Sequence, residues 1–94
     1  FCADNEENLI PENVSIVTYE PPTSISPAPA DTPENAGKVA KTLKTRTSID
    51  TVLYGGNVTS ENVSSFTQMP NIDGVLVGRA SLDAQEFCTI IQNA

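Results

Sequence analysis

Three short segments of the sequence carry residues that could do chemistry, and each follows an apolar run rich in Val, Leu or Ile. Glu20 follows the run 14–19, Gly55-Gly56-Asn57 follows the run 51–54, and Gly78-Arg79 follows the run 75–77. A carboxylate that is partly desolvated can act as a general base. Backbone N–H groups at a glycine turn that leads into a helix favour an anion, typically phosphate. Together these residues predict a base beside a phosphate cradle.

The same residues have plainer interpretations, which the sequence leaves open. An acidic residue is usually no more than surface, and Glu20 differs by ending an uncharged strand ahead of a long loop. The pair Gly55-Gly56 can be a strand-to-helix turn that needs positive φ, although a second glycine turn one unit later favours a shared anion site. Asn57 is either structural or a donor to the anion. Arg79 either adds a point charge for phosphate or lies along the rim of the site.

Parallel strands are the elements that would bring these segments to one edge. The runs 14–19, 51–54 and 75–77 are predicted to be short strands, the first of them buried on both faces. The first run is followed by Glu20-Pro21 and the other two by glycine, and residues 1–3 resemble the end of one more strand. Strands that alternate with helices form a parallel sheet whose carboxyl ends share one edge. We therefore predict an α/β fold in which each parallel strand is followed by a helix.

Helix-start signals follow each turn. Thr32-Pro33-Glu34-Asn35 combines an N-cap threonine, a proline at the first helical position and an acidic residue, and Thr59-Ser60-Glu61-Asn62 nearly repeats this signal. The last helix is predicted to begin at a Ser81 cap. Apolar residues at helical spacing are expected to be buried: Ala36, Val39, Ala40 and Leu43 in the first helix, Val63 and Phe66 with Met69 in the second, and Ala84, Phe87, Cys88 and Ile91 in the last.

The segment 21–31 is uncharged up to its last residue and holds four of the seven prolines. Such a composition is typical either of an interdomain linker or of a functional loop over a site. A linker has little reason to separate a strand from the next helix of the same sheet, so we favour the loop. Tyr54 and Asp73, by contrast, are interpreted as structural residues.

The bulk properties exclude several classes of partner. The chain of 94 residues has a formal charge of −7, which argues against nucleic acid and anionic membranes. No apolar run approaches the length of a membrane span. Most of the cations lie in one predicted helix and are interpreted as a solvated face, namely Lys38, Lys41, Lys44 and Arg46.

Cys2 and Cys88 are expected to be free, buried thiols in a reducing cytoplasm. We expect one small domain, 1–94, that is a piece of a larger protein.

Three motifs resemble a known family, triosephosphate isomerase. They are Tyr19-Glu20-Pro21, Leu53-Tyr-Gly-Gly-Asn-Val-Thr-x-Glu-Asn62 and Ile72-Asp-Gly-Val-Leu-Val-Gly-x-Ala-Ser-Leu82. The last two are specific together, in this order and at the family's spacing. The resemblance runs from about residue 14 to the end, with residues 2–5 similar to the end of the preceding strand. It implies the C-terminal part of a (β/α)8 barrel, the last three strand–helix units with a strand remnant ahead of them.

The resemblance also implies roles for individual residues. Glu20 matches the family's base, which moves a proton between adjacent carbons of dihydroxyacetone phosphate and glyceraldehyde 3-phosphate. The loop from Pro21 matches a lid that shields the enediolate from water. The phosphate is held by backbone amides, here near Ser26, Asn57, Gly78 and Arg79, with Gly55 and Gly56 supporting the first turn. Neither a metal nor a cofactor is implied, and the full-length protein is expected to be a cytoplasmic homodimer that takes a triose phosphate.

The sequence departs from the family pattern at informative places. The usual lid motif Trp-x-Ile-Gly-Thr-Gly is replaced by residues 23–28, which keep only Ile25. Asn57 replaces a serine, and Arg79 replaces the second glycine of the last turn. The chain has no histidine, and the family's electrophilic histidine and substrate-binding lysine come from its N-terminal half. We therefore expect the chain to be inactive alone. The alternatives are a non-catalytic half-barrel that binds phosphate and another phosphate-binding (β/α)8 enzyme.

Overall fold

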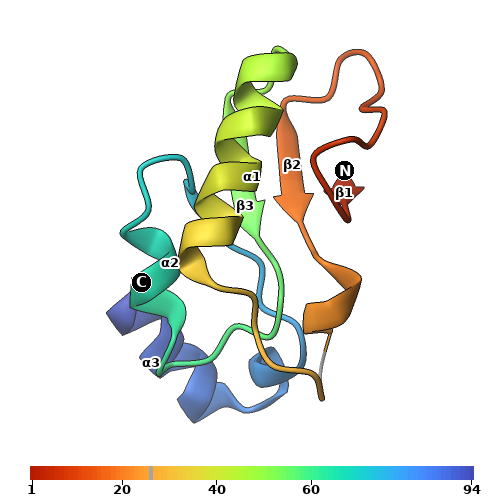
Figure 1. Ribbon diagram of the computed structural model, residues 1–94. Helices are drawn as coiled ribbons and strands as arrows, with labels where there is room; N and C mark the ends of the chain where they lie inside the picture. Colours follow the sequence, from red (N-terminus) through yellow and green to blue (C-terminus); the bar gives the residue numbers. More distant parts are fainter. Residues whose placement is uncertain (26) are drawn as a thin grey trace.

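The computed structural model describes residues 1–25 and 27–94 and contains one parallel sheet. Its strands are β1 (Cys2–Ala3), β2 (Ile16–Tyr19), β3 (Thr51–Tyr54) and β4 (Gly74–Val75), in the order β1-β2-β3-β4. Every neighbouring pair runs parallel, with Tyr19 opposite Tyr54 and Tyr54 opposite Val75. The segments that follow β2, β3 and β4 gather at the carboxyl edge of the sheet, the lower edge in Figure 1. This arrangement confirms the predicted α/β class and is that of a partial (β/α)8 barrel.

The helices alternate with the strands. The 3-10 turn η1 (Pro22–Ser24) follows β2, α1 (Pro33–Arg46) precedes β3, α2 (Val63–Thr67) precedes β4, and η2 (Arg79–Leu82) leads into α3 (Ala84–Asn93). In Figure 1, α1 crosses in front of β3, and α2 lies beside it, toward α3. As predicted, the Thr32 side chain caps α1 by accepting a hydrogen bond from the Asn35 N–H. Among the described residues, no helix is long and apolar enough to cross a membrane.

The core is formed by side chains from the sheet and from α1, α2 and α3. Its largest fully buried side chains are Tyr54, Phe66, Leu43, Ile90, Val17, Val52 and Val63. The rings of Tyr54 and Phe66 stack with centroids 3.9 Å apart, which joins the end of β3 to α2. Gly37 lets α1 approach Met69, because an added Cβ would lie 2.8 Å from the Met69 Cε. The four residues predicted to form the apolar stripe of the first helix are all buried, namely Ala36, Val39, Ala40 and Leu43.

Several element boundaries differ from the predictions. The strand predicted at 14–19 starts at Ile16, which is 51% exposed, so only its last three residues are buried. The strand predicted at 75–77 is Gly74–Val75, followed by one more ladder bond from the Leu76 N–H to the Tyr54 carbonyl. The second helix begins at Val63, because the Asn62 side chain accepts from the Thr59 N–H and holds the preceding residues in a turn.

The prediction for the last helix is wrong in its cap and in its buried face. Asp83, not Ser81, caps α3 by accepting from the Glu86 N–H, while the Ser81 hydroxyl donates to the Gly78 carbonyl. Ile90 is buried, whereas the predicted residues are exposed, namely Ala84, Phe87, Cys88 and Ile91. α3 contacts α2 and η2, and these contacts leave the four predicted residues exposed.

The predictions for the two cysteines and for the cationic face of the first helix are each wrong in part. Cys2 and Cys88 are free, as predicted, but both are exposed rather than buried. The cationic face of α1 is not wholly solvated, because the Lys44 ammonium lies 2.6 Å from the Asp73 carboxylate. Arg46 also donates to the Asn8 carbonyl, at 2.5 Å. Asp73 accepts a hydrogen bond from the Val52 N–H as well, which agrees with its interpretation as a structural residue.

Candidate active site

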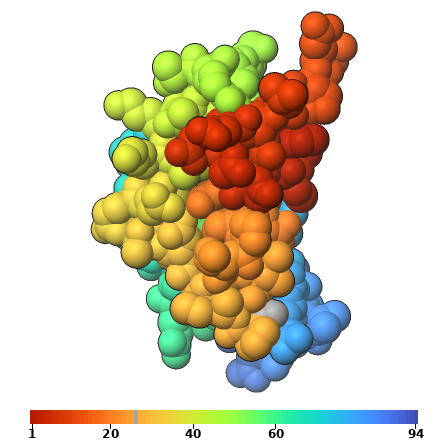
Figure 2. All heavy atoms as spheres, turned by 45° about the vertical axis from the view of Figure 1, so that its right-hand side comes forward, coloured from red at the N-terminus to blue at the C-terminus, as the bar shows by residue number. Residues whose placement is uncertain are grey.

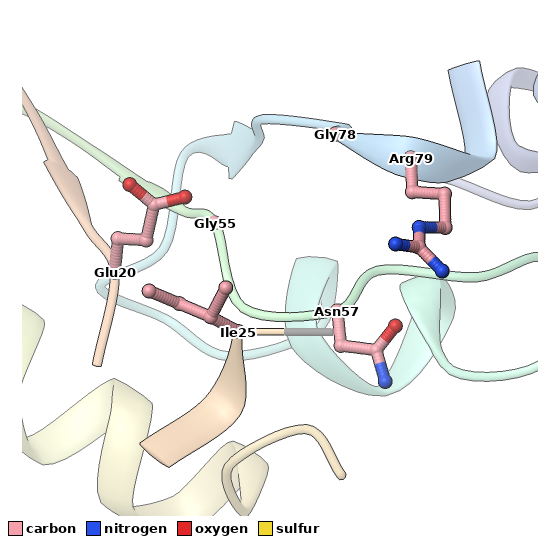
Figure 3. Close-up of a pocket in the computed structure, with 6 residues that line it drawn as sticks. All are labelled: Glu20, Ile25, Gly55, Asn57, Gly78 and Arg79. Atoms are coloured by element: carbon pink, nitrogen blue, oxygen red, sulfur yellow. The ribbon is translucent and has the colours of Figure 1, made fainter. Parts of the chain in front are cut away.

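A pocket of about 230 Å³ opens at the carboxyl edge of the sheet. Its lining comes from the three segments singled out in the sequence and from the loop after β2: Glu20, Ile25, Gly55, Asn57, Gly78 and Arg79. Figure 3 shows the carboxylate of Glu20 at one end of this group and the guanidinium of Arg79, with Asn57 near it, at the other. The structure thus brings an acidic group and a basic group, far apart in sequence, to opposite ends of one cavity.

The position of Glu20 follows from the β2 register. The backbone N–H of Glu20 donates to the Ala3 carbonyl at 2.8 Å, which continues the ladder to β1 one residue past the strand. The next backbone N–H along the sheet, that of Gly55, donates to the Tyr19 carbonyl at 2.8 Å. Pro21 follows at once and is buried, so the ladder ends there. Glu20 is therefore held at the strand tip with its side chain half-buried at the pocket wall.

The first glycine turn is tightly packed. A Cβ at Gly55 would lie 2.8 Å from the Thr18 Cγ2. A Cβ at Gly56 would collide with the Tyr54 hydroxyl and would lie 2.8 Å from the Ser24 Cβ. The turn interpretation required a positive φ at the glycine pair, but neither glycine has one. The residue of this turn in the left-handed region is Asn57, at φ 50°. The glycines are thus needed for close approach of the backbone rather than for an unusual backbone angle.

The side chain of Asn57 has a different partner from the one considered for it. Its Nδ2 donates to the Ala28 carbonyl at 2.8 Å, so the side chain ties the turn to the loop 21–31. The Asn57 carbonyl in turn accepts from the Asn62 Nδ2 at 3.0 Å. With its amide engaged in this way, Asn57 would meet an anion through its backbone N–H. Ser26, the loop residue predicted to contribute an amide, lies outside the described residues.

The second glycine turn is open. Gly78 is exposed, and a Cβ added there would meet no atom within 4 Å. The Gly78 carbonyl accepts from both the N–H and the hydroxyl of Ser81, which closes η2. Arg79 begins η2, and its exposed side chain extends along the pocket toward Asn57 (Figure 3). This position agrees with both interpretations left open for Arg79, a point charge for an anion and a place along the rim of the site.

The loop after β2 covers one side of the pocket. Ile25, the lid residue that the sequence keeps, contributes to the lining although its side chain is 56% exposed. Figure 2 shows the surface of this loop, in orange and yellow, meeting the blue surface of the chain beyond β4. The loop is therefore a surface loop over the pocket rather than a linker between domains.

Sequence reasoning missed the contacts that anchor the far end of this loop. The Tyr19 hydroxyl donates to the Asp31 Oδ2 at 3.1 Å, and the Asp31 N–H donates to the Tyr54 hydroxyl at 2.8 Å. Burial, and then the nearby Asp31 charge, raise the pKa of Tyr19 far above its usual value. Burial likewise raises the pKa of Tyr54. The raised pKa values favour the protonated form of both phenols. The signal in the sequence for these contacts is a tyrosine at the end of each of the two strands.

Comparisons with known proteins agree on one family. The family model described as triosephosphate isomerase matches residues 3–94. The triosephosphate isomerase of Blochmanniella pennsylvanica is 44% identical over 88 residues, which cover 85% of this chain and 34% of that protein. The triosephosphate isomerase of Nitrosococcus oceani is 39% identical over 88 residues, which cover 85% of this chain and 35% of that protein. The chain spans about a third of the length of these relatives. On this agreement, the chain belongs to the triosephosphate isomerase family.

Proposed function

We propose that the chain is the C-terminal part of a triosephosphate isomerase and supplies the base and the phosphate subsite of its active site. The observation that carries this proposal is one pocket whose lining has Glu20, beside Gly55, at one end and Asn57, Gly78 and Arg79 toward the other. A triose phosphate has the same two-ended form, with exchangeable carbon-bound protons at one end and a phosphate at the other.

In the proposed reaction, Glu20 acts as a general base. Its carboxylate removes a proton from the hydroxyl-bearing carbon of dihydroxyacetone phosphate, and the electron pair of the broken C–H bond forms the C=C bond of the enediolate while the carbonyl oxygen takes the negative charge. The hydroxyl proton then passes from the oxygen of the first carbon to the oxygen of the second. The carboxylic acid returns the abstracted proton to the second carbon, which gives glyceraldehyde 3-phosphate. The base is regenerated, and no electrons enter or leave the substrate. The half-buried strand-tip position of Glu20 suits this role because the following proline and loop restrict its contact with water.

The phosphate end of the substrate is proposed to lie against the two glycine turns. The backbone N–H groups of Asn57, Gly78 and Arg79 are the proposed donors, and Ser26 is the proposed donor from the loop. Gly55 and Gly56 support the first turn, since any side chain at Gly56 would collide with Tyr54. Among the described residues that line the pocket, Arg79 is the one with a positive charge, and this charge complements a dianion.

The pocket lacks one component of the reaction. Proton abstraction beside a carbonyl is slow unless a donor stabilises the oxyanion that develops, and the chain has no histidine. We propose that this donor lies in the remaining two thirds of a full-length protein and that the chain is inactive alone. The full-length protein is then proposed to be a cytoplasmic homodimer that acts in glycolysis.

The test uses the full-length protein with Glu20→Gln, which keeps the size of the side chain but removes its basicity. We expect turnover of glyceraldehyde 3-phosphate to fall by about 10²–10⁴-fold, the usual contribution of a general base. Affinity for inorganic phosphate should change little, because the amides and Arg79 are untouched. The matched control is Glu12→Gln, an exposed acid before the same strand, which should keep full turnover.

Other outcomes would decide against the proposal. If turnover and phosphate affinity fall together in Glu20→Gln, the carboxylate is not the base. If the unmodified full-length protein binds phosphate but does not interconvert triose phosphates, the non-catalytic phosphate-binding barrel is the better description.

A further inference from the structure

Ser60, which lies three residues beyond Asn57 of the first glycine turn, is bonded to α3 through all of its polar groups. Its backbone N–H donates to the Glu86 Oε1 at 2.8 Å, and its hydroxyl donates to the Glu86 Oε2 at 3.1 Å. Its carbonyl accepts from the Asn93 Nδ2 at 2.9 Å. Ser60 and Glu86 are 26 positions apart, and both are half-buried. We call the two bonds from Ser60 to the Glu86 carboxylate the clamp.

The Glu86 carboxylate is not used to start its own helix. Asp83 and Glu86 have the spacing of a capping box, in which the acidic side chain at the third helical position accepts from the N–H of the cap residue. Here the Asp83 N–H donates instead to the Ala80 carbonyl at 3.3 Å. The Asp83 side chain caps α3 by accepting from the Glu86 N–H. The Glu86 carboxylate therefore makes a contact between elements rather than one within the helix.

On one side, the clamp holds a segment that is fixed to the first glycine turn. The Asn62 side chain donates to the Asn57 carbonyl at 3.0 Å and accepts from the Thr59 N–H at 2.8 Å. Ser60 lies inside this closed segment, which runs from the turn to the start of α2. A displacement of Ser60 would therefore be passed back to Asn57.

On the other side, the clamp holds a segment that is fixed to the second glycine turn. Ser81 donates to the Gly78 carbonyl through both its N–H and its hydroxyl, which closes η2 behind the turn. The Asp83 cap then joins η2 to the first turn of α3, where Glu86 lies. A displacement of Glu86 would therefore be passed back to Gly78 and Arg79.

The two glycine turns are thus joined both ahead of the pocket and beyond it. Ahead of it, β3 pairs with β4, and the Leu76 N–H donates to the Tyr54 carbonyl at 2.9 Å. Beyond it, the clamp joins the two chain segments that leave the turns, where α3 lies beside α2 (Figure 1). An anion that is bound by both turns requires a fixed distance between them. The clamp is placed to hold that distance on the side away from the sheet.

We propose that Glu86 is a positioning residue that fixes the spacing of the two glycine turns and so sets the affinity of the pocket for a phosphate group. This inference rests on the phosphate subsite of the proposed function. Among the described residues, Glu86 is not part of the pocket lining, and it acts through Ser60 and α3. When the turns are correctly spaced for a fraction of the time, the apparent dissociation constant rises by the inverse of that fraction.

The negative charge of Glu86 separates this role from a simple electrostatic effect. Removing an acidic group from the neighbourhood of an anion site strengthens anion binding, because like charges repel each other. Removing a group that positions the site weakens anion binding. The two effects have opposite signs, so the direction in which phosphate affinity changes distinguishes them.

The experiment measures binding of inorganic phosphate to the full-length protein by isothermal titration. Glu86→Ala removes both bonds of the clamp, and we expect its dissociation constant to rise about tenfold, as for turns that are correctly spaced about a tenth of the time. Glu86→Gln keeps an oxygen that accepts from the Ser60 N–H and removes the charge. It should bind phosphate nearly as well as the unmodified protein.

Ser60→Ala tests the other side of the clamp with a milder change. It removes the hydroxyl bond and keeps the bond from the backbone N–H, so its loss of phosphate affinity should be smaller than that of Glu86→Ala. The double variant should bind phosphate no more weakly than Glu86→Ala, because both changes remove the same interaction.

Two control variants keep the clamp. Glu61→Ala removes an exposed acid next to Ser60, and it should not weaken phosphate binding. Ile90→Val trims a buried side chain of the same helix, so it should lower the melting temperature without a loss of phosphate affinity.

Turnover provides a second readout that a general loss of stability would not produce. In Glu86→Ala, kcat/KM for glyceraldehyde 3-phosphate should fall by about the same factor as phosphate affinity. For glyceraldehyde, which has no phosphate, kcat/KM should stay as in the unmodified protein, because Glu20 is untouched.

The positioning role is overturned if Glu86→Ala binds phosphate as tightly as the unmodified protein or more tightly. A loss of affinity in Ile90→Val that matches the loss in Glu86→Ala would also contradict it, since affinity would then follow stability. Failure of the isomerase function gives a different result, in which the variants keep this order of phosphate affinities but the unmodified protein does not interconvert triose phosphates. An unmodified full-length protein that binds no phosphate would overturn both proposals.

Discussion

The two glycine turns of the pocket look alike in the sequence but differ in their surroundings. At the first turn, a Cβ on Gly56 would collide with the Tyr54 hydroxyl, and Asn57 bonds to both the loop and Asn62. At the second turn, Gly78 is exposed and has open space where a Cβ would be. One glycine is therefore required by packing, and the other is free of that constraint. The first turn is thus a rigid wall of the pocket, and the second is its accessible side.

The largest expected effect that separates the turns comes from adding one methyl group to each. Gly56→Ala should destabilise the full-length protein by about 1–3 kcal/mol, the usual cost of overpacking, because Tyr54 and Ser24 are both buried and cannot move away. Gly78→Ala should leave the melting temperature nearly unchanged. Thermal denaturation of both variants checks this. Equal destabilisation by the two substitutions would show that the turns do not differ in packing.

A smaller effect is expected at the open turn when its charge is removed. Arg79→Ala should weaken binding of inorganic phosphate by about two- to fivefold, since an exposed ionic contact contributes up to about 1 kcal/mol. The loss should shrink as salt is added, because salt screens exposed charges. Isothermal titration at low and high salt measures it. Lys41→Ala, which removes an exposed cation from α1, is the control and should bind phosphate normally.

The smallest effect concerns a contact away from both turns. Burial alone would raise the pKa of Asp73, but hydrogen bonds from Lys44 and from the Val52 N–H outweigh it and lower this pKa. A carboxylate with a lowered pKa in the folded state stabilises the fold above its ordinary pKa, and this stability is lost as the pH falls through the folded pKa. Denaturant titrations at about pH 7 and pH 3 should thus show that the free energy of unfolding falls more on acidification in the unmodified protein than in Asp73→Asn. An equal fall in both proteins would exclude this contribution from Asp73.

Much of the fold follows from local signals that needed no tertiary information. The strand 51–54 is predicted at its exact bounds, because its apolar run ends at a glycine pair. The cap of α1 by Thr32 also follows from the sequence, since capping is a contact between residues three apart. Glu20 and both glycine turns line one pocket because parallel strands place their carboxyl ends at one edge.

What the sequence could not predict depends on contacts between distant residues. The contacts of Asp31 with Tyr19 and Tyr54 join residues 12 and 23 positions apart, and no local pattern marks the pairing. The prediction of the buried face of α3 is wrong for a related reason. An apolar stripe shows which face of a helix could be buried, but the neighbouring elements decide whether that face is buried. Phe87 and Ile91, which fit the stripe, are therefore exposed while Ile90 is buried.

The central claim is that a base at one strand tip faces an anion cradle made by the next two strands. The most direct measurement follows the backbone amide signals of the full-length protein during titration with inorganic phosphate, in the unmodified form and in Glu20→Gln. We predict that the amides of Asn57, Gly78 and Arg79 shift in both forms while that of Ser48, at the opposite edge of the sheet, does not. Phosphate-dependent shifts that avoid the two glycine turns would contradict the account.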